Sequence, residues 1–221
     1  MTRHFLTAVA TVLVLGATAI VRADPERLKN AEAVLTEMAG SQAGDKGIPL
    51  DLLKKAKCLV IIPSVHKAAL GIGGEYGRGY FACRRGAGWS APGSMRIEGG
   101  SVGLQIGGSA TDVILAVMND SGLERLLSSK FTVGADAAVA AGPVGRQTQA
   151  ETDITLKAEI LSWSRSKGAF AGLSLKGSTL REDSDENKQL YGKDISNRDI
   201  FAGKATTPPS AAGLMSALAK Y

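Results

Sequence analysis

The sequence predicts an α+β fold in which curved, glycine-rich antiparallel β-sheets form a sandwich or barrel-like body, with N-terminal helices and short peripheral helices. The first observation is the segment 71–108, which holds 13 of the 27 glycines. Aromatic and apolar residues separate these glycines, whereas a flexible linker would lack them. The second is the strand-like alternation of Val102, Leu104 and Ile106 with glycine and glutamine. Because glycine inside a strand marks a bulge, a bend or a close backbone approach, we expect curved and tightly packed strands.

The third observation is a helical pattern over 24–39. Asp24 can cap this helix, and Pro25 suits its first turn. Its apolar residues recur at three- and four-residue spacing: Leu28, Ala31, Leu35 and Met38. The opposite face mixes acidic and basic residues, whereas a membrane-surface helix is expected to carry a more basic polar face. We therefore expect this helix to pack on the protein core.

The remaining elements follow from apolar runs and turn residues. Strands are expected over 59–62, ending at Pro63, and over 111–119, 133–144, 152–164 and 169–175. Short helices are expected over 49–56, over 123–127 with Ser121 as the N-cap, and over 186–191.

The chain divides into three parts. Residues 1–23 are predicted to be a signal peptide, because Arg3 precedes a short apolar run and small residues end the segment before Asp24. Residues 24–203 form the expected domain. Residues 204–221 form a tail that either docks on the body or stays loose, with Leu214, Leu218 and Tyr221 as one apolar stripe. We expect export, and a location that is periplasmic or peripheral to the membrane.

The charge excludes some partners. The chain carries 26 Lys and Arg against 21 Asp and Glu, a net charge of +5, and cleavage before Asp24 would remove Arg3 and Arg22 and leave +3. Nucleic-acid-binding domains are usually much more basic, so no nucleic-acid partner is expected. The densest basic cluster after the signal peptide is Lys54, Lys55 and Lys57. Such a cluster is either a solvated surface or a binding site.

Two cysteines, Cys58 and Cys83, remain after cleavage into an oxidising compartment. They either form one disulfide or lie as two separate buried thiols, and the sequence leaves both alternatives open. No metal site is expected, because His66 is the one histidine beyond the signal peptide. No cofactor is expected either.

The sequence does not suggest an enzyme. The glycines from Gly71 to Gly74 lack the spacing of a dinucleotide loop, since Tyr76 stands where the third glycine belongs, and no P-loop motif follows. Ser64 and His66 lie two residues apart without an identifiable third partner. We therefore expect a non-enzymatic protein.

Several segments, in this order, make the chain resemble the SYLF domain family over about residues 28–201. They are Lys55–Pro63, Gly71–Gly79, Trp89–Pro92, Gly99–Gly107 with Asp112, Gly142–Arg146, Ser164–Ser174 and Asn187–Tyr191. The resemblance implies a lipid-binding module. Eukaryotic relatives bind phosphoinositides, yeast relatives also bind actin, and bacterial members are exported.

Because export would remove actin and phosphoinositides as partners, we expect this chain to bind anionic phospholipid at a membrane surface. The residues expected to contact headgroups are Lys54, Lys55, Lys57, Arg84 and Arg85. The alternative is a structural or protein-interaction module of the cell envelope, in which the tail or an exposed sheet edge meets a protein partner.

Overall fold

The computed structural model describes residues 25–39, 47–144, 158–166, 169–170, 175 and 177–221. The predicted signal peptide, residues 152–157 and residues 171–174 lie outside the described residues. The elements are α1 (Pro25–Ala39), α2 (Leu50–Lys55), β1 (Cys58–Arg85), β2 (Gly88–Trp89), β3 (Gly93–Val117), α3 (Asp120–Leu126), β4 (Lys130–Thr132), β5 (Val139–Ala141), β6 (Ile160–Ser166), β7 (Ala169–Phe170), β8 (Thr179–Glu182), α5 (Ser184–Tyr191), α6 (Asn197–Phe201), the 3₁₀ turn η2 (Pro209–Ala211) and α7 (Ala212–Leu218).

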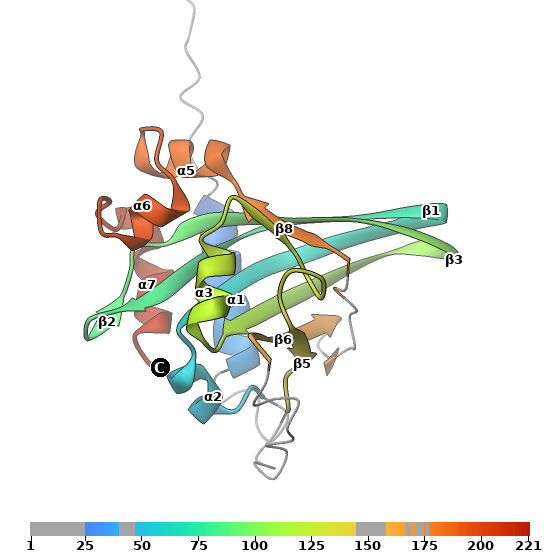
Figure 1. Cartoon of the computed structure of the whole chain (residues 1–221), viewed down its shortest axis with the longest axis horizontal. Coiled ribbons are helices and arrows are strands. Elements are labelled where there is room, and N and C mark those ends of the chain that lie inside the picture. Colours follow the sequence, from blue (N-terminus) through green and yellow to red (C-terminus); the bar gives the residue numbers. More distant parts are fainter. Residues whose placement is uncertain (1–24, 40–46, 145–157, 167–168, 171–174, 176) are drawn as a thin grey trace, which may run out of the picture.

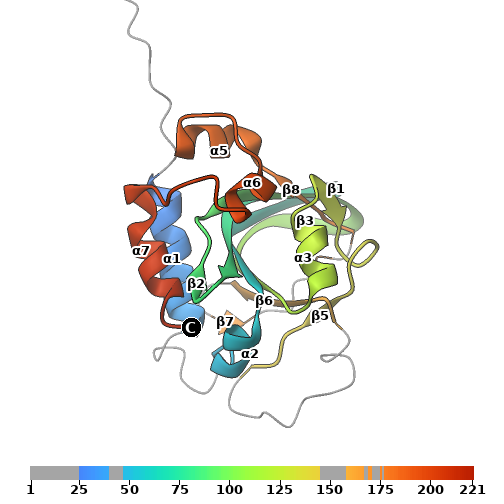
Figure 2. The same cartoon turned by 60° about the vertical axis from the view of Figure 1, so that its left-hand side comes forward.

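The predicted α+β class is confirmed: the described strands form one curled, mostly antiparallel sheet that makes a half-barrel, with helices around it (Figures 1 and 2). The strand order is β2-β1-β3-β6-β5, β7 pairs with β6, and β8 pairs with both β3 and β4. Only the β5–β6 pair is parallel among these pairings. The long strands β1 and β3 pair from Cys58 opposite Val117 to Phe81 opposite Gly93.

Strand β1 doubles back on itself, and this bend closes the half-barrel. The amide of Arg84, near its end, donates to the carbonyl of Lys57, just before its start, at 2.7 Å. Cys58 and Cys83 are joined by a disulfide in the same place. At Gly79, a Cβ atom would lie 2.0 Å from the carbonyl oxygen of Ile61. The missing side chain therefore lets the two halves of β1 approach closely, as expected for glycine in a strand.

Two apolar clusters lie on the two faces of the sheet. The interior cluster includes Val60, Phe81, Met95 and Leu180, all buried. The outer cluster joins the sheet to α1 and α7, which lie side by side in both views (Figures 1 and 2). Because successive strand residues point to opposite faces, β1 and β3 contribute to both clusters.

The first helix forms as the apolar spacing predicts, and Leu28, Ala31, Leu35 and Met38 are all buried. The tail docks rather than remaining loose. Leu214 and Leu218 of α7 are buried against α1. The indole nitrogen of Trp89 donates to the carbonyl of Leu218 at 2.9 Å. This apolar stripe is therefore part of the core and does not face a partner.

The strand expected over 133–144 is largely wrong, since a turn follows Val133 and only Val139–Ala141 form a strand there. Two further local expectations were also wrong. Pro63 does not end its strand: β1 continues through a bulge between Ile62 and Val65, where the pairing register shifts. A bulge tolerates proline because the extra residues leave the ladder. Ser64 adopts a positive φ of 55° there, and its amide donates to Asp112.

The second correction concerns the cap of α3. Asn119, and not Ser121, is the N-cap, and its side chain accepts a hydrogen bond from the amide of Gly122. The Ser121 hydroxyl instead bonds to Glu159. Asparagine and serine are about equally good caps, so residue type did not distinguish them.

Candidate functional site

The basic residues predicted from the sequence gather around the C-terminal end of α2. Lys54 and Lys55 are exposed in the last turn of this helix. The guanidinium of Arg84 reaches the same turn, donating to the carbonyls of Leu53 at 3.3 Å and Lys54 at 3.2 Å. Lys57 lies two residues after the end of α2. The fold therefore brings four of the five predicted residues together, in what we call the α2 end.

Arg84 has a structural role within this group. Besides the α2 carbonyls, it donates to the main-chain oxygen of Tyr221 at 2.8 Å. Its guanidinium carbon also lies 4.3 Å from the centroid of the Trp89 ring. Burial lowers the pKa of Arg84 from its usual value. Since its donors are committed to α2 and the C-terminal residue, Arg84 shapes the α2 end and does not project from it.

Two other predicted residues also have intramolecular partners. The Lys57 ammonium lies 2.7 Å from a carboxylate oxygen of Asp120, at the start of α3. Both side chains are well exposed, so this pair is weak and solvent screens it. Arg85 donates to the carbonyl of Ala202, just after α6, at 3.0 Å. The structure thus separates Arg85 from the lysines by directing it toward α6.

An apolar residue accompanies the two lysines of α2. Leu50, in the first turn of this helix, is 49% exposed. Lys54 lies four residues later, and side chains at this spacing share one face of a helix. Leu53 is fully buried and fixes the helix on the outer cluster. The α2 end therefore presents an exposed leucine beside two exposed lysine residues on a firmly packed support.

A buried ionic cluster, which the sequence did not reveal, lies at the start of α5. Arg78 binds the buried carboxylate of Asp183 through two nitrogens, at 2.5 and 2.8 Å. Glu186 accepts from the Tyr80 hydroxyl at 2.7 Å and pairs with Arg27 at 2.8 Å. The pKa of Tyr80 is raised by burial and by the bond to Glu186. Because these residues come from β1, α1 and the start of α5, the cluster ties both helices to the sheet.

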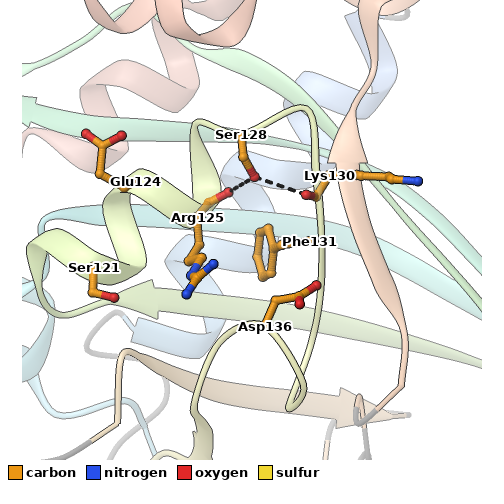
Figure 3. Close-up of a pocket in the computed structure, with 7 residues that line it drawn as sticks. All are labelled: Ser121, Glu124, Arg125, Ser128, Lys130, Phe131 and Asp136. Atoms are coloured by element: carbon orange, nitrogen blue, oxygen red, sulfur yellow. Dashed lines mark hydrogen bonds between the residues drawn. The ribbon is translucent and has the colours of Figure 1, made fainter.

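A surface pocket of about 480 Å³ lies beside α3 and β4. It is lined by Ser121, Glu124, Arg125, Ser128, Lys130, Phe131 and Asp136 (Figure 3). The Ser128 hydroxyl donates within the turn, to the carbonyl of Arg125 at 2.6 Å, and the Asp136 carboxylate accepts from the amide of Thr132 at 2.6 Å. Acidic and basic side chains are balanced here, so the pocket itself has no strong charge preference.

The described residues offer no metal site, since no three His, Cys, Asp or Glu residues among them gather at one place. Ser64 and His66 are both exposed on β1, and the carboxylate of Asp112 bonds the Ser64 amide and not the imidazole. In the part of the chain that the structure describes, no helix is long and apolar enough to span a bilayer.

The curled sheet with its helices defines a class of domain: an α+β half-barrel. The family model described as "Las17-binding protein actin regulator" matches residues 98–221. The chain therefore belongs to the Ysc84 (SYLF) family, as the order of its motifs predicts.

Several curated relatives are similar to most of the chain. "SH3 domain-containing YSC84-like protein 1" of Bos taurus is 33% identical over 188 residues, covering 84% of this chain and 55% of the relative. "Protein YSC84" of Saccharomyces cerevisiae is 34% identical over 176 residues, covering 77% of this chain and 37% of the relative. The chain thus spans about half or less of the length of these relatives.

Proposed function

We propose that the chain is a non-enzymatic module that binds anionic phospholipid headgroups at a membrane surface through its α2 end. The observation that carries this proposal is the exposed Leu50 on the same short helix as the exposed Lys54 and Lys55. Lysines near an anionic surface each contribute about 1 kcal/mol, and this attraction weakens as salt screens it. Leu50 adds apolar area that can enter the headgroup boundary.

The site proposed here is narrower than the five residues expected from the sequence. Lys54 and Lys55 are its principal contacts, and Lys57 joins them where the lipid competes with Asp120 for its ammonium group. Arg84 supports the surface from beneath through its bonds to α2. Arg85 lies toward α6 and contributes to the positive field of this end.

The test is co-sedimentation with phosphatidylglycerol vesicles against phosphatidylcholine vesicles, at low and high salt, using residues 24–221. We expect salt-sensitive binding to the anionic vesicles alone. Lys54→Glu with Lys55→Glu should weaken it by roughly 30-fold or more, since two contacts of about 1 kcal/mol each are lost. The matched control, Lys188→Glu with Lys193→Glu, makes the same charge change near α5, at the opposite end of the molecule from α2 (Figures 1 and 2).

Equal loss in both double variants would show that overall charge, and not the α2 end, drives vesicle binding. If Lys54→Glu with Lys55→Glu left vesicle binding unchanged, the α2 end would not be the lipid-binding surface. Leu50→Ser tests the apolar contribution separately, because it leaves the charge intact.

We also propose that the protein acts after export, in the periplasm or on the membrane facing it. The signal-like segment 1–23 supports this location. So does the disulfide between Cys58 and Cys83, since disulfides persist in oxidising compartments. Cell fractionation followed by N-terminal sequencing should recover a mature chain that begins at Asp24. An intact N-terminus in the cytosolic fraction would contradict export.

A second candidate function is protein binding. The family description and the name of a yeast relative, "LAS seventeen-binding protein 3", support it, since both specify a protein partner for those proteins. In an exported chain the partner would be an envelope protein. A purified chain that ignores all vesicles, yet captures one envelope protein reproducibly, would favour this function over lipid binding.

A further inference from the structure

The register of the sheet places four basic residues in one line. Arg78 of β1 lies opposite Arg96 of β3, Arg96 lies opposite Arg181 of β8, and Arg181 lies opposite Lys130 of β4. Residues that lie directly opposite each other in antiparallel strands point to the same face. We call these four residues the basic row.

Without compensating partners, such a row would destabilise the folded sheet, because like charges that lie directly opposite each other repel. At one end the cost is offset: Arg78 binds the buried Asp183, and one nitrogen of Arg96 lies 4.0 Å from the same carboxylate. Glu98 lies 2.7 Å from Arg96 and 3.5 Å from Arg181. The carboxylates therefore concentrate at the Arg78 end.

Positive charge remains at the other end of the row. Arg181 shares Glu98 with Arg96, and its Nε atom is buried without a hydrogen-bond partner among the described residues. Lys130 is exposed, and its ammonium has no ion-pair partner within 4.0 Å in the described part of the chain. In Figure 3 its side chain points away from Arg125 and Phe131. The outer half of the row is thus a cationic strip that is only partly neutralised, because Arg181 shares one carboxylate with Arg96.

The depth of the row distinguishes between kinds of anionic partner. The side chain of Arg96 is 23% exposed and that of Arg78 is 26% exposed, whereas Arg181 is 42% exposed. A flat bilayer surface would reach the exposed outer end but not the recessed inner end. An extended peptide can lower individual carboxylates toward recessed guanidinium groups, and arginine is well suited to binding carboxylates.

Next to the basic row lies a second row on the same face, two residues along each strand: Tyr76, Glu98, Thr179 and Thr132. Tyr76 is 45% exposed, and a partly exposed tyrosine is a common contact in protein interfaces. Glu98 follows Tyr76 in this row, and the two threonines make its β8 and β4 end polar and short. The face therefore offers exposed cationic groups on β8 and β4 beside short polar side chains, with an aromatic residue at the β1 end, which fits a narrow extended segment.

We propose that the basic row is a docking surface for an extended acidic segment of a protein partner, with Arg181 and Lys130 as its main contacts. This surface is separate from the α2 end and does not depend on lipid binding. The partner segment would place aspartate or glutamate side chains over the row, where they complete the neutralisation that Glu98 and Asp183 begin.

The test uses a fluorescein-labelled peptide of alternating glutamate and threonine, with a glutamine–threonine peptide as the neutral probe, and fluorescence anisotropy as the measurement. The acidic peptide should bind in a salt-sensitive way, and the neutral peptide should not. Arg181→Gln with Lys130→Gln should lower the affinity for the acidic peptide by 10-fold or more. Arg78 and Arg96 are left unchanged, because they pair with the buried Asp183.

The matched control is Lys188→Gln with Lys193→Gln, which removes the same charge near α5. Thermal unfolding shows whether the variants fold, and Arg181→Gln with Lys130→Gln should keep or raise the melting temperature, since it relieves repulsion between like charges. Equal weakening in the control variant, or unchanged peptide affinity in the row variant, would overturn the proposal. If the row variant lost vesicle binding and kept peptide affinity, the row would be a membrane contact instead.

Discussion

Glycine at position 79 shows how a single residue controls the closure of the sheet. Its missing side chain is required because the main chain of Ile61 crosses directly over it. We expect Gly79→Ala to lower the free energy of unfolding by about 3 kcal/mol or more, since the contact is with backbone that cannot rotate away. Urea denaturation measures the change. Gly100→Ala is the control, because no atom lies within 4 Å of its added Cβ.

Gly100→Ala should change stability by less than about 0.5 kcal/mol, as exposed substitutions usually do. If Gly79→Ala changed stability as little as Gly100→Ala, the two halves of β1 would not approach each other closely at Gly79. The comparison is clean because both glycines lie in the paired region of β1 and β3.

Tyr80 should make the stability of the protein decrease at alkaline pH. Burial, and then the hydrogen bond to Glu186, raise its pKa above the usual value of about 10. A raised pKa in the folded state means that stability is fully present below pH 10 and is lost as pH rises, because only the unfolded chain ionises readily. The urea concentration at the unfolding midpoint should therefore decrease as the pH rises above about 10, in a range where other tyrosines also contribute.

Tyr80→Phe should reduce the steepness of that fall, while lowering stability at neutral pH because Glu186 loses a donor. Tyr76→Phe is the comparison, since Tyr76 is exposed. If Tyr80→Phe and Tyr76→Phe had the same alkaline slope, Tyr80 would not be the group responsible.

At the scale of elements, β1 is one long strand that bends so that its two ends meet. The disulfide between Cys58 and Cys83 holds its ends together across 25 residues. Opening a loop of this length should cost about 3 kcal/mol, through the greater freedom of the unfolded chain. We expect Cys58→Ala with Cys83→Ala to lower the free energy of unfolding, measured by urea denaturation, by that amount.

Reduction with dithiothreitol should destabilise the parent chain but not this double variant, which separates the disulfide from the packing of the two side chains. If the reductant left the parent unchanged, the bond would contribute no stability. Both residues are fully buried, so the reductant must be added to unfolded protein before the transition is measured.

Elements with strong periodicity were predictable from the sequence, because their pattern reflects one buried face. Helix α1 and the buried end of β3 are examples, and the glycine-rich segment gave the curvature of the sheet. The bulge at Pro63 was not predictable. A proline after four apolar residues looks like a strand end, and only the partner strand shows that pairing resumes at Val65.

For the candidate sites too, the sequence predicted local clusters but not groups that depend on tertiary contacts. Lys54, Lys55 and Lys57 are close in the sequence, so their cluster was visible at once. The basic row joins residues 78, 96, 181 and 130, and its formation depends on strand register, which is set by long-range pairing. Arg84 was recognised as a basic residue, but its bonds to α2 and Tyr221 depend on tertiary contacts.

At the scale of the whole molecule, the α2 end and the basic row are different surfaces, on different elements of the fold. Helix α2 lies at the bottom of the molecule in both views, and α5, which follows β8, lies at the top (Figures 1 and 2). Lys54 and Lys55 lie on α2, whereas Arg181 lies on β8 and Lys130 on β4. Substitutions at separated sites without shared partners usually have additive effects.

If both proposals hold, the protein can bridge a membrane and an acidic protein segment. Labelled glutamate–threonine peptide should sediment with phosphatidylglycerol vesicles only when the protein is present, since peptide and vesicle repel each other. Either double variant, Lys54→Glu with Lys55→Glu or Arg181→Gln with Lys130→Gln, should abolish this co-sedimentation, and each should change the other surface's own affinity by less than about 2-fold. Mutually exclusive binding of peptide and vesicle would show instead that both ligands use one surface, because a bridge requires the two to be occupied at the same time.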